Sequence, residues 1–164
     1  MNSFEILPGD ADSTVILHVP HSSTVIPADV REGILLSNDE LAAELAAITD
    51  THTDVIAIGA ANRASVRPWR FVNRMSRLVI DPERFPDERE ELNAVGMGAV
   101  YEKTSDLQTL RTPTAEERDD LIARFFEPYA AAMAQLVRER LAAVGKVTII
   151  DVHSFPNKAK RYEL

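Results

Sequence analysis

The feature that most constrains this chain is a series of four short apolar runs, rich in valine and isoleucine, three of which stop at a polar cluster. These runs occupy residues 14–19, 55–59, 78–80 and 147–150. Short β-branched runs bounded by turn residues are typical of buried strands. The sequence therefore predicts four short strands, three of which deliver polar side chains to their carboxyl ends.

Helical patterns lie between these runs. Residues 37–40 (SNDE) form a capping pattern before an amphipathic stretch, and Thr114 with Glu117 forms another before the longest apolar face, which ends at Gly145. Pro128 is expected to kink this second helix, because its ring removes a backbone donor. Alternating strands and helices predict an α/β, three-layer fold whose mostly parallel or mixed central sheet is flanked by helices, with its site beyond the strand carboxyl ends.

Composition excludes several classes of protein. A chain of 164 residues is the size of one domain, and because it has no Cys any metal must be held by His, Asp or Glu. Its net charge of −8 disfavours nucleic acid as a partner. No apolar run is long enough to cross a membrane, and the N-terminus lacks the pattern of a signal peptide, so a cytoplasmic protein is expected.

Four polar clusters end the predicted strands and the first helix. They occupy residues 20–23, 50–54, 81–84 and 151–154. Two imidazoles and one carboxylate suit Zn²⁺ with a position open to water. A single histidine after a strand is more often structural, but His21 and His153 have matching contexts and are each followed by serine. His18, inside the first strand, is interpreted as a core or supporting residue.

Asp50 and Asp54 are four residues apart and share one face if the first helix continues through them. Acids at a helix C-terminus oppose its dipole, so a bound cation is one explanation and a solvated helix end is the other. The arginines between residues 63 and 84 favour a carboxylate-bearing ligand, unless they only neutralise neighbouring acids.

Four motifs resemble, in order, those of the N-formylglutamate amidohydrolase family. They are residues 18–23 (HVPHSS), 50–54 (DTHTD), 76–84 (SRLVIDPER) and 151–154 (DVHS). The resemblance implies a single domain over residues 1–164 with a phosphorylase/hydrolase-like, zinc exopeptidase-like fold. It further implies hydrolysis of N-formyl-L-glutamate to L-glutamate and formate in histidine breakdown.

By motif position, the resemblance implies that His21 and His153 bind Zn²⁺ or another divalent metal. An acid of the 50–54 motif would be the third ligand. Asp54 is the preferred ligand, and Asp50 is the alternative; Asp50 is also counted among the catalytic residues. These assignments follow from the family's motifs and not from spacing alone.

The same resemblance implies that Ser22, Arg77, Asp81 and Arg84 bind a small-molecule carboxylate substrate. Glu83 stands where the family usually has Asn, a departure that leaves another N-acyl amino acid open as the substrate.

Family members continue well beyond the second histidine motif, whereas 11 residues follow His153 here. A C-terminally incomplete domain and a compact member with a rearranged general base are both open, and Glu163 is the candidate base. The alternatives to the enzyme are a non-catalytic anionic-ligand-binding member of the fold and another amide hydrolase such as a peptidoglycan amidase. A sheet edge at residues 147–150 would favour a homo-oligomer.

Overall fold

The computed structural model describes residues 2–155. The strands are β1 (Phe4–Leu7), β2 (Val15–Val19), β3 (Trp69–Asn73) and β4 (Thr148–Asp151). The α-helices are α1 (Ala28–Glu32), α2 (Asn38–Ile48), α3 (Thr53–Arg63), α4 (Ala115–Leu121) and α5 (Glu127–Val144). A 3₁₀ helix, η1 (Glu91–Val95), and a π-helix, η2 (Ile122–Phe126), complete the regular structure.

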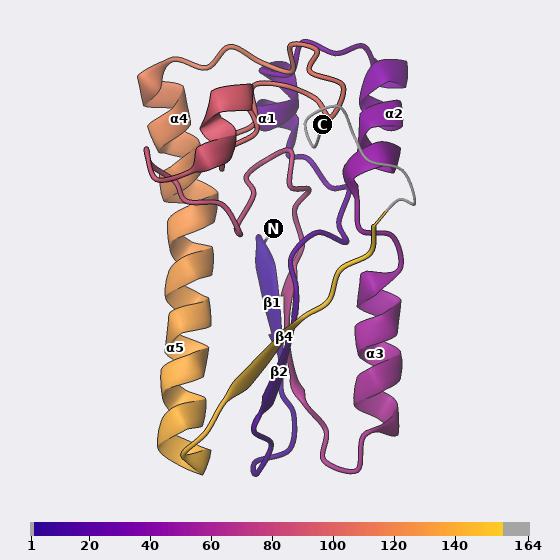
Figure 1. Cartoon of the computed structure of the whole chain (residues 1–164), viewed down its shortest axis with the longest axis vertical. Helices are drawn as coiled ribbons and strands as arrows, with labels where there is room; N and C mark the ends of the chain where they lie inside the picture. The colour runs from indigo at the N-terminus through magenta and orange to yellow at the C-terminus, as the bar shows by residue number, and fades with distance from the viewer. Residues whose placement is uncertain (1, 156–164) are drawn as a thin grey trace.

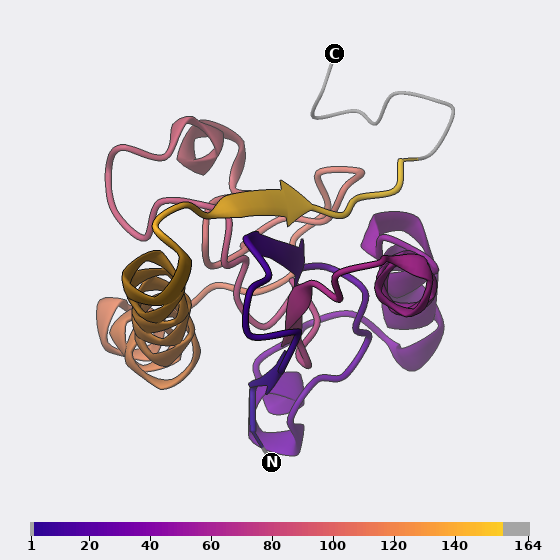
Figure 2. The same cartoon turned by 90° about the horizontal axis from the view of Figure 1, so that it is seen from below.

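The strands form one mixed sheet in the order β1-β3-β2-β4. β2 is parallel to both β3 and β4, and β1 is antiparallel to β3. Figures 1 and 2 show α4 and α5 on one side of this sheet and α2 and α3 on the other. The expected three-layer α/β fold with a mostly parallel sheet is confirmed.

The two faces of β2 pack against different layers of the fold. Ile16 packs with Phe71 against Tyr129 of α5, while Val19 packs in a separate cluster with Ala57 of α3. Alternate residues of a strand face opposite sides of a sheet, so His18 shares the α5 face with Ile16. The core therefore packs against β2 on both faces, and this packing fixes the position of the carboxyl end of β2, where His21 follows.

The prediction of a strand at residues 55–59 is wrong, because this run lies inside helix α3. Small residues form the buried face of α3: Thr53, Ala57 and Ala61 are buried at a spacing of four, whereas Val55 is 59% exposed. When a helix packs against a sheet through small side chains, its sequence lacks the stripe of large apolar residues that normally predicts a helix and its buried face.

The prediction of a strand at residues 78–80 is also wrong. These residues are buried, but they form a turn in which the Val79 amide donates to the Ser76 carbonyl at 2.9 Å. The neighbouring strand is β3, which lies within the arginine-rich segment. A short buried run has the same apolar signature whether it forms a strand or a turn.

The helix ends follow the expected capping. Ser37 and Thr114 both form capping boxes, and Gly145 ends α5 in the left-handed region with φ 75°. A π-helix lies just before Pro128, which is in the first turn of α5, and a kink at Pro128 stays a prediction. Helical residues precede Pro128 without a break, and because proline has no N–H the regular i→i−4 hydrogen bond is missing there.

β4 forms an edge of the sheet. Within the described part of the chain it pairs only with β2, and its four residues are all exposed. The expected open edge is confirmed, and self-association through it stays a prediction. Across residues 2–155, the helices are too short or too polar to cross a membrane.

Candidate metal centre

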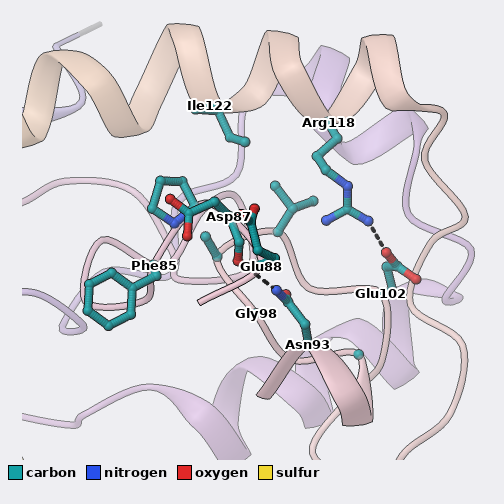
Figure 3. Close-up of a pocket in the computed structure, with 12 residues that line it drawn as sticks. Phe85, Asp87, Glu88, Asn93, Gly98, Glu102, Arg118 and Ile122 are labelled. Carbon is teal, nitrogen blue, oxygen red and sulfur yellow. Dashed lines mark hydrogen bonds and ion pairs between the residues drawn. The ribbon is translucent and has the colours of Figure 1, made fainter. Parts of the chain in front are cut away.

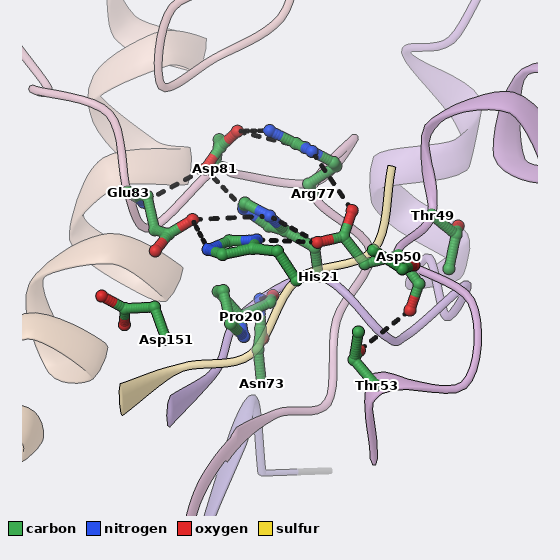
Figure 4. A network of polar contacts seen from close by, with 12 residues as sticks. Pro20, His21, Thr49, Asp50, Thr53, Asn73, Arg77, Asp81, Glu83 and Asp151 are labelled. Carbon is green, nitrogen blue, oxygen red and sulfur yellow. Dashed lines mark hydrogen bonds and ion pairs between the residues drawn. The ribbon is translucent and has the colours of Figure 1, made fainter. Parts of the chain in front are cut away.

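Three side chains from distant segments meet beyond the carboxyl ends of β2 and β4 (Figure 4). His21 follows β2 and is 2% exposed, His153 follows β4, and Glu83 follows the buried turn. One ligand atom from each of these residues lies within 4.8 Å of the others. Parallel neighbouring strands bring their carboxyl ends to one sheet edge, as the sequence predicted for the two histidines.

Asp81 is the acceptor around which this centre is organised. Its Oδ1 accepts from His21 Nε2 at 2.9 Å and from the Glu83 amide at 3.1 Å, and its Oδ2 accepts from Arg77 at 2.7 Å and from the Tyr101 hydroxyl at 2.8 Å. Burial would raise the pKa of the Asp81 carboxyl, but His21 and Arg77 hold that pKa well below its usual value. Asp81 is therefore a buried carboxylate at neutral pH.

This contact determines the tautomer of neutral His21. An ionised carboxylate only accepts hydrogen bonds, so Nε2 of His21 carries the proton and Nδ1 carries a lone pair. Nδ1 is buried, has no hydrogen-bond partner among residues 2–155 and lies 3.5 Å from Glu83 Oε2. Burial would lower the pKa of His21, but Asp81 raises it, so a proton and a metal ion compete for Nδ1. A buried, unpaired nitrogen lone pair beside a carboxylate is the donor arrangement that a metal ion requires.

His153 is also oriented by a carboxylate, but through its other ring nitrogen. Its Nδ1 donates to Asp50 Oδ2 at 2.7 Å, which leaves the lone pair on Nε2, 3.4 Å from Glu83 Oε2. Burial would raise the pKa of the Asp50 carboxyl, but the neighbouring imidazoles of His21 and His153 outweigh burial and lower this pKa. Two neutral imidazoles oriented by carboxylates, with a third carboxylate between them, fit Zn²⁺ with a position left open.

The expectation that Asp54 is the third ligand needs correction. Helix α2 ends at Ile48, and Asp50 lies in the following turn with its amide bonded to the His21 carbonyl at 3.0 Å. Asp54 lies in the first turn of α3, accepts from the Val55 amide at 2.8 Å and belongs to no metal-binding cluster of the described residues. The two acids do not share a helical face, because the helix does not continue between them.

The predicted substrate-binding residues differ in what they can reach. Asp81 is fully buried with its oxygens already paired, so it supports the site and cannot contact a substrate. Arg77 is bound to Asp81 through two nitrogens. The Arg84 amide donates to the Asp81 carbonyl at 3.3 Å, but the Arg84 side chain donates no hydrogen bond to another described residue, and its Nε lies 3.8 Å from Asp81 Oδ2. Ser22 is half-buried beside His21.

The predicted base, Glu163, lies outside the described residues. Glu83 and Tyr101 are the site residues that sequence reasoning missed. Glu83 was visible as a departure from the family motif, and the absence of cysteine already limited the possible metal ligands to His, Asp and Glu. Tyr101 had no local signal, because it reaches Asp81 from a loop 20 residues away.

A separate cavity of about 320 Å³ is lined by residues that lie between Phe85 and Ile122 in the sequence (Figure 3). Its polar groups pair with one another: Arg118 with Glu102, and the Asn93 side chain with the Asp87 carbonyl. These groups have their partners already, so the chemistry of the site lies at the histidines.

Comparisons with known proteins agree with this fold. The chain is similar to a crystal structure of N-formylglutamate amidohydrolase from Ralstonia eutropha JMP134, with 25% identity and a TM-score of 0.78 over 96% of this chain and 59% of that one. It also resembles a gene product of Agrobacterium tumefaciens, with 23% identity and a TM-score of 0.73 over 94% of this chain and 57% of that one.

The chain thus spans less than two thirds of the length of these solved structures. A comparison with curated proteins finds no match. The model of the family described as N-formylglutamate amidohydrolase matches residues 13–163, which include both histidine motifs. The chain therefore belongs to the N-formylglutamate amidohydrolase family.

Proposed function

We propose that this protein is a metal-dependent amidohydrolase that cleaves an N-acyl amino acid, with N-formyl-L-glutamate as the substrate and L-glutamate and formate as the products. The observation that carries the proposal is the pair of oriented imidazoles: His21 Nδ1 and His153 Nε2 both present lone pairs toward Glu83. Family membership supports the reaction class.

Zn²⁺ held by these three residues would polarise the amide carbonyl and lower the pKa of water to roughly 7. Asp81 and Asp50 act through the imidazoles: each accepts a hydrogen bond from one ring nitrogen and keeps the other nitrogen unprotonated. Such supporting contacts hold ligands in place before the metal arrives, which limits the ordering that binding must impose.

The substrate's carboxylate requires a cation, and Arg84 is the arginine of the site that has hydrogen-bonding capacity to spare. Arg77 is committed to Asp81 through hydrogen bonds, whereas the Arg84 side chain is 28% exposed and makes only a 3.8 Å ion pair with Asp81 within the described residues. A guanidinium binds a carboxylate through two parallel hydrogen bonds. Ser22 adds a hydroxyl beside His21, and Glu163 as general base remains part of the proposal.

A single set of measurements tests this function. Purified protein is assayed for formate release from N-formyl-L-glutamate and for release of a free amino group from N-acetyl-L-glutamate and from a muramyl-peptide amide. Its metal content is measured on the same sample. We expect chelator-sensitive formate release that is lost in His153→Ala and kept in His52→Asn, a histidine outside the cluster.

The outcomes separate the candidate functions. Full turnover by metal-free protein would refute the metal-dependent mechanism. Bound metal without turnover of any amide would favour the anionic-ligand-binding alternative, and preference for the muramyl-peptide amide would favour the amidase. Light scattering of the same sample tests the proposed homo-oligomer.

A further inference from the structure

A second cluster of metal-ligating side chains adjoins the first. His18 and Asp151 are register partners on the parallel strands β2 and β4, so their side chains project from the same face of the sheet. His18 Nδ1 lies 2.6 Å from Asp151 Oδ1 and 3.9 Å from Glu83 Oε1. Ligand atoms of His18, Asp151 and Glu83 lie within 4.8 Å of one another.

Glu83 belongs to both clusters through different oxygens. Its Oε2 faces His21 Nδ1 at 3.5 Å and His153 Nε2 at 3.4 Å, whereas its Oε1 faces His18. A carboxylate whose two oxygens point to separate nitrogen donors has the arrangement of a bridging ligand. This division of the Glu83 oxygens is a property of the side chain's position and does not depend on the identity of any ion.

The other side of the His18 ring is fixed by a tyrosine. His18 Nε2 lies 2.5 Å from the Tyr129 hydroxyl, and the ring also contacts Phe71 edge to face at 6.1 Å between centroids. In the metal-free protein His18 Nδ1 donates to the Asp151 carboxylate and Nε2 accepts from the Tyr129 hydroxyl. Because a tyrosine hydroxyl can also accept, an ion that displaces the Nδ1 proton would leave Nε2 to donate to Tyr129, and the lone pair on Nδ1 would then face Asp151 and Glu83. A ligating histidine usually donates its other ring N–H in this way.

The charge of this second cluster is unbalanced. Within residues 2–155, no lysine or arginine nitrogen lies within 4.0 Å of a carboxylate oxygen of Glu83 or Asp151. The nearby guanidinium of Arg77 is bound to Asp81 instead. Asp151 is 49% exposed, which gives an ion and its water ligands a path from solvent.

We propose that His18, Asp151 and Glu83 form a second divalent-cation site and that Glu83 bridges it to the His21–His153 site, so that the centre binds two ions. The mixed nitrogen and oxygen donors suit Zn²⁺, Co²⁺ or Mn²⁺. The second ion places positive charge beside the first, where a substrate carboxylate also binds. The inference rests on the proposed function only for the first ion.

The test is the number of ions that each chain binds. Chelator-treated full-length protein is titrated with Co²⁺ in a calorimeter, and the bound metal is then measured by elemental analysis. We expect two Co²⁺ per chain in the wild type, one in Asp151→Asn and one in His153→Ala. Asp54→Asn, an acid outside both clusters, should retain two.

A spectroscopic readout tests the bridge. Two Mn²⁺ ions that share a carboxylate give an exchange-coupled electron paramagnetic resonance spectrum, which Asp151→Asn should convert to that of an isolated ion. Glu83→Gln should lose the coupling in the same way. Circular dichroism of each variant shows that the fold is retained, and Asp151 lies on an exposed strand where an amide is tolerated.

Each outcome has one meaning. One ion per chain that is kept in Asp151→Asn and lost in His153→Ala would overturn the second site and leave the proposed function standing. One ion that is lost in Asp151→Asn and kept in His153→Ala would support the second site and contradict the first. No bound ion would refute both.

Discussion

Replacing Asp81 by asparagine should destabilise the metal-free protein more than any conservative change at the surface. The side chain of Asp81 is 0% exposed and accepts from Arg77, whose own side chain is 12% exposed. The amide introduced by Asp81→Asn keeps one acceptor oxygen but removes the negative charge opposite a buried guanidinium. Breaking a buried ion pair from one side costs about 3–5 kcal/mol.

That cost is large against the whole stability of a domain, which is about 5–15 kcal/mol. For a chain of this size, 1 kcal/mol corresponds to about 2–4 °C in Tm, so Asp81→Asn should lower Tm by about 6–20 °C. Urea denaturation at pH 7, followed by circular dichroism and by the fluorescence of Trp69, measures the free energy of unfolding.

The matched control is Asp87→Asn. Asp87 also pairs with an arginine, Arg89, at 2.6 Å, but the two side chains are 36% and 65% exposed. Solvent screens such a pair, so this variant should match the wild type. Equal losses of stability in Asp81→Asn and Asp87→Asn would refute the argument that burial makes the Asp81 contact strong. Asp81→Asn should also weaken metal binding by about 10–100-fold, because His21 loses its orienting acceptor.

Three further predictions concern the metal-free protein. Because the pKa of Asp81 is lower in the folded than in the unfolded state, the free energy of unfolding should fall as the pH drops below about 4, and Asp81→Asn should flatten this acid limb in urea titrations at several pH values. Gly9→Ala should cost about 1–3 kcal/mol, since its Cβ would lie 2.4 Å from the Arg67 carbonyl oxygen, whereas Gly33→Ala, with no contact under 3.6 Å, should not lower Tm. Ser37→Ala should cost about 1 kcal/mol in urea denaturation, because α2 loses its capping box; an unchanged midpoint would contradict this.

The parts of the fold that sequence predicted are those decided locally. The capping boxes at Ser37 and Thr114 and the left-handed cap at Gly145 depend on residues within one turn. The strands that end before His21 and His153 have β-branched runs with clear stops. Helix α3 could not be predicted in the same way, because its orientation follows from small residues that allow close approach to the sheet.

The site was predictable to the level of its histidines but not of its acids. Asp50 and Asp54 are equivalent in sequence, and only the turn after α2 shows that Asp50 faces His153. Glu83 reaches the histidines because the buried turn before it is anchored by Asp81, whose contact with His21 joins residues 60 positions apart. Tertiary contacts of this kind have no signature in a local window of sequence.

The position of β4 determines when a metal site can first exist. His21 is made early in synthesis, but His153 follows about 130 residues later, which at about 5–20 residues per second is a delay of roughly 7–26 s. Until β4 pairs with β2, Nδ1 of His21 and the carboxylate of Glu83 have no second imidazole to complete a ligand set. Metal uptake would therefore follow the pairing of β4 with β2, and it would report that this pairing has formed.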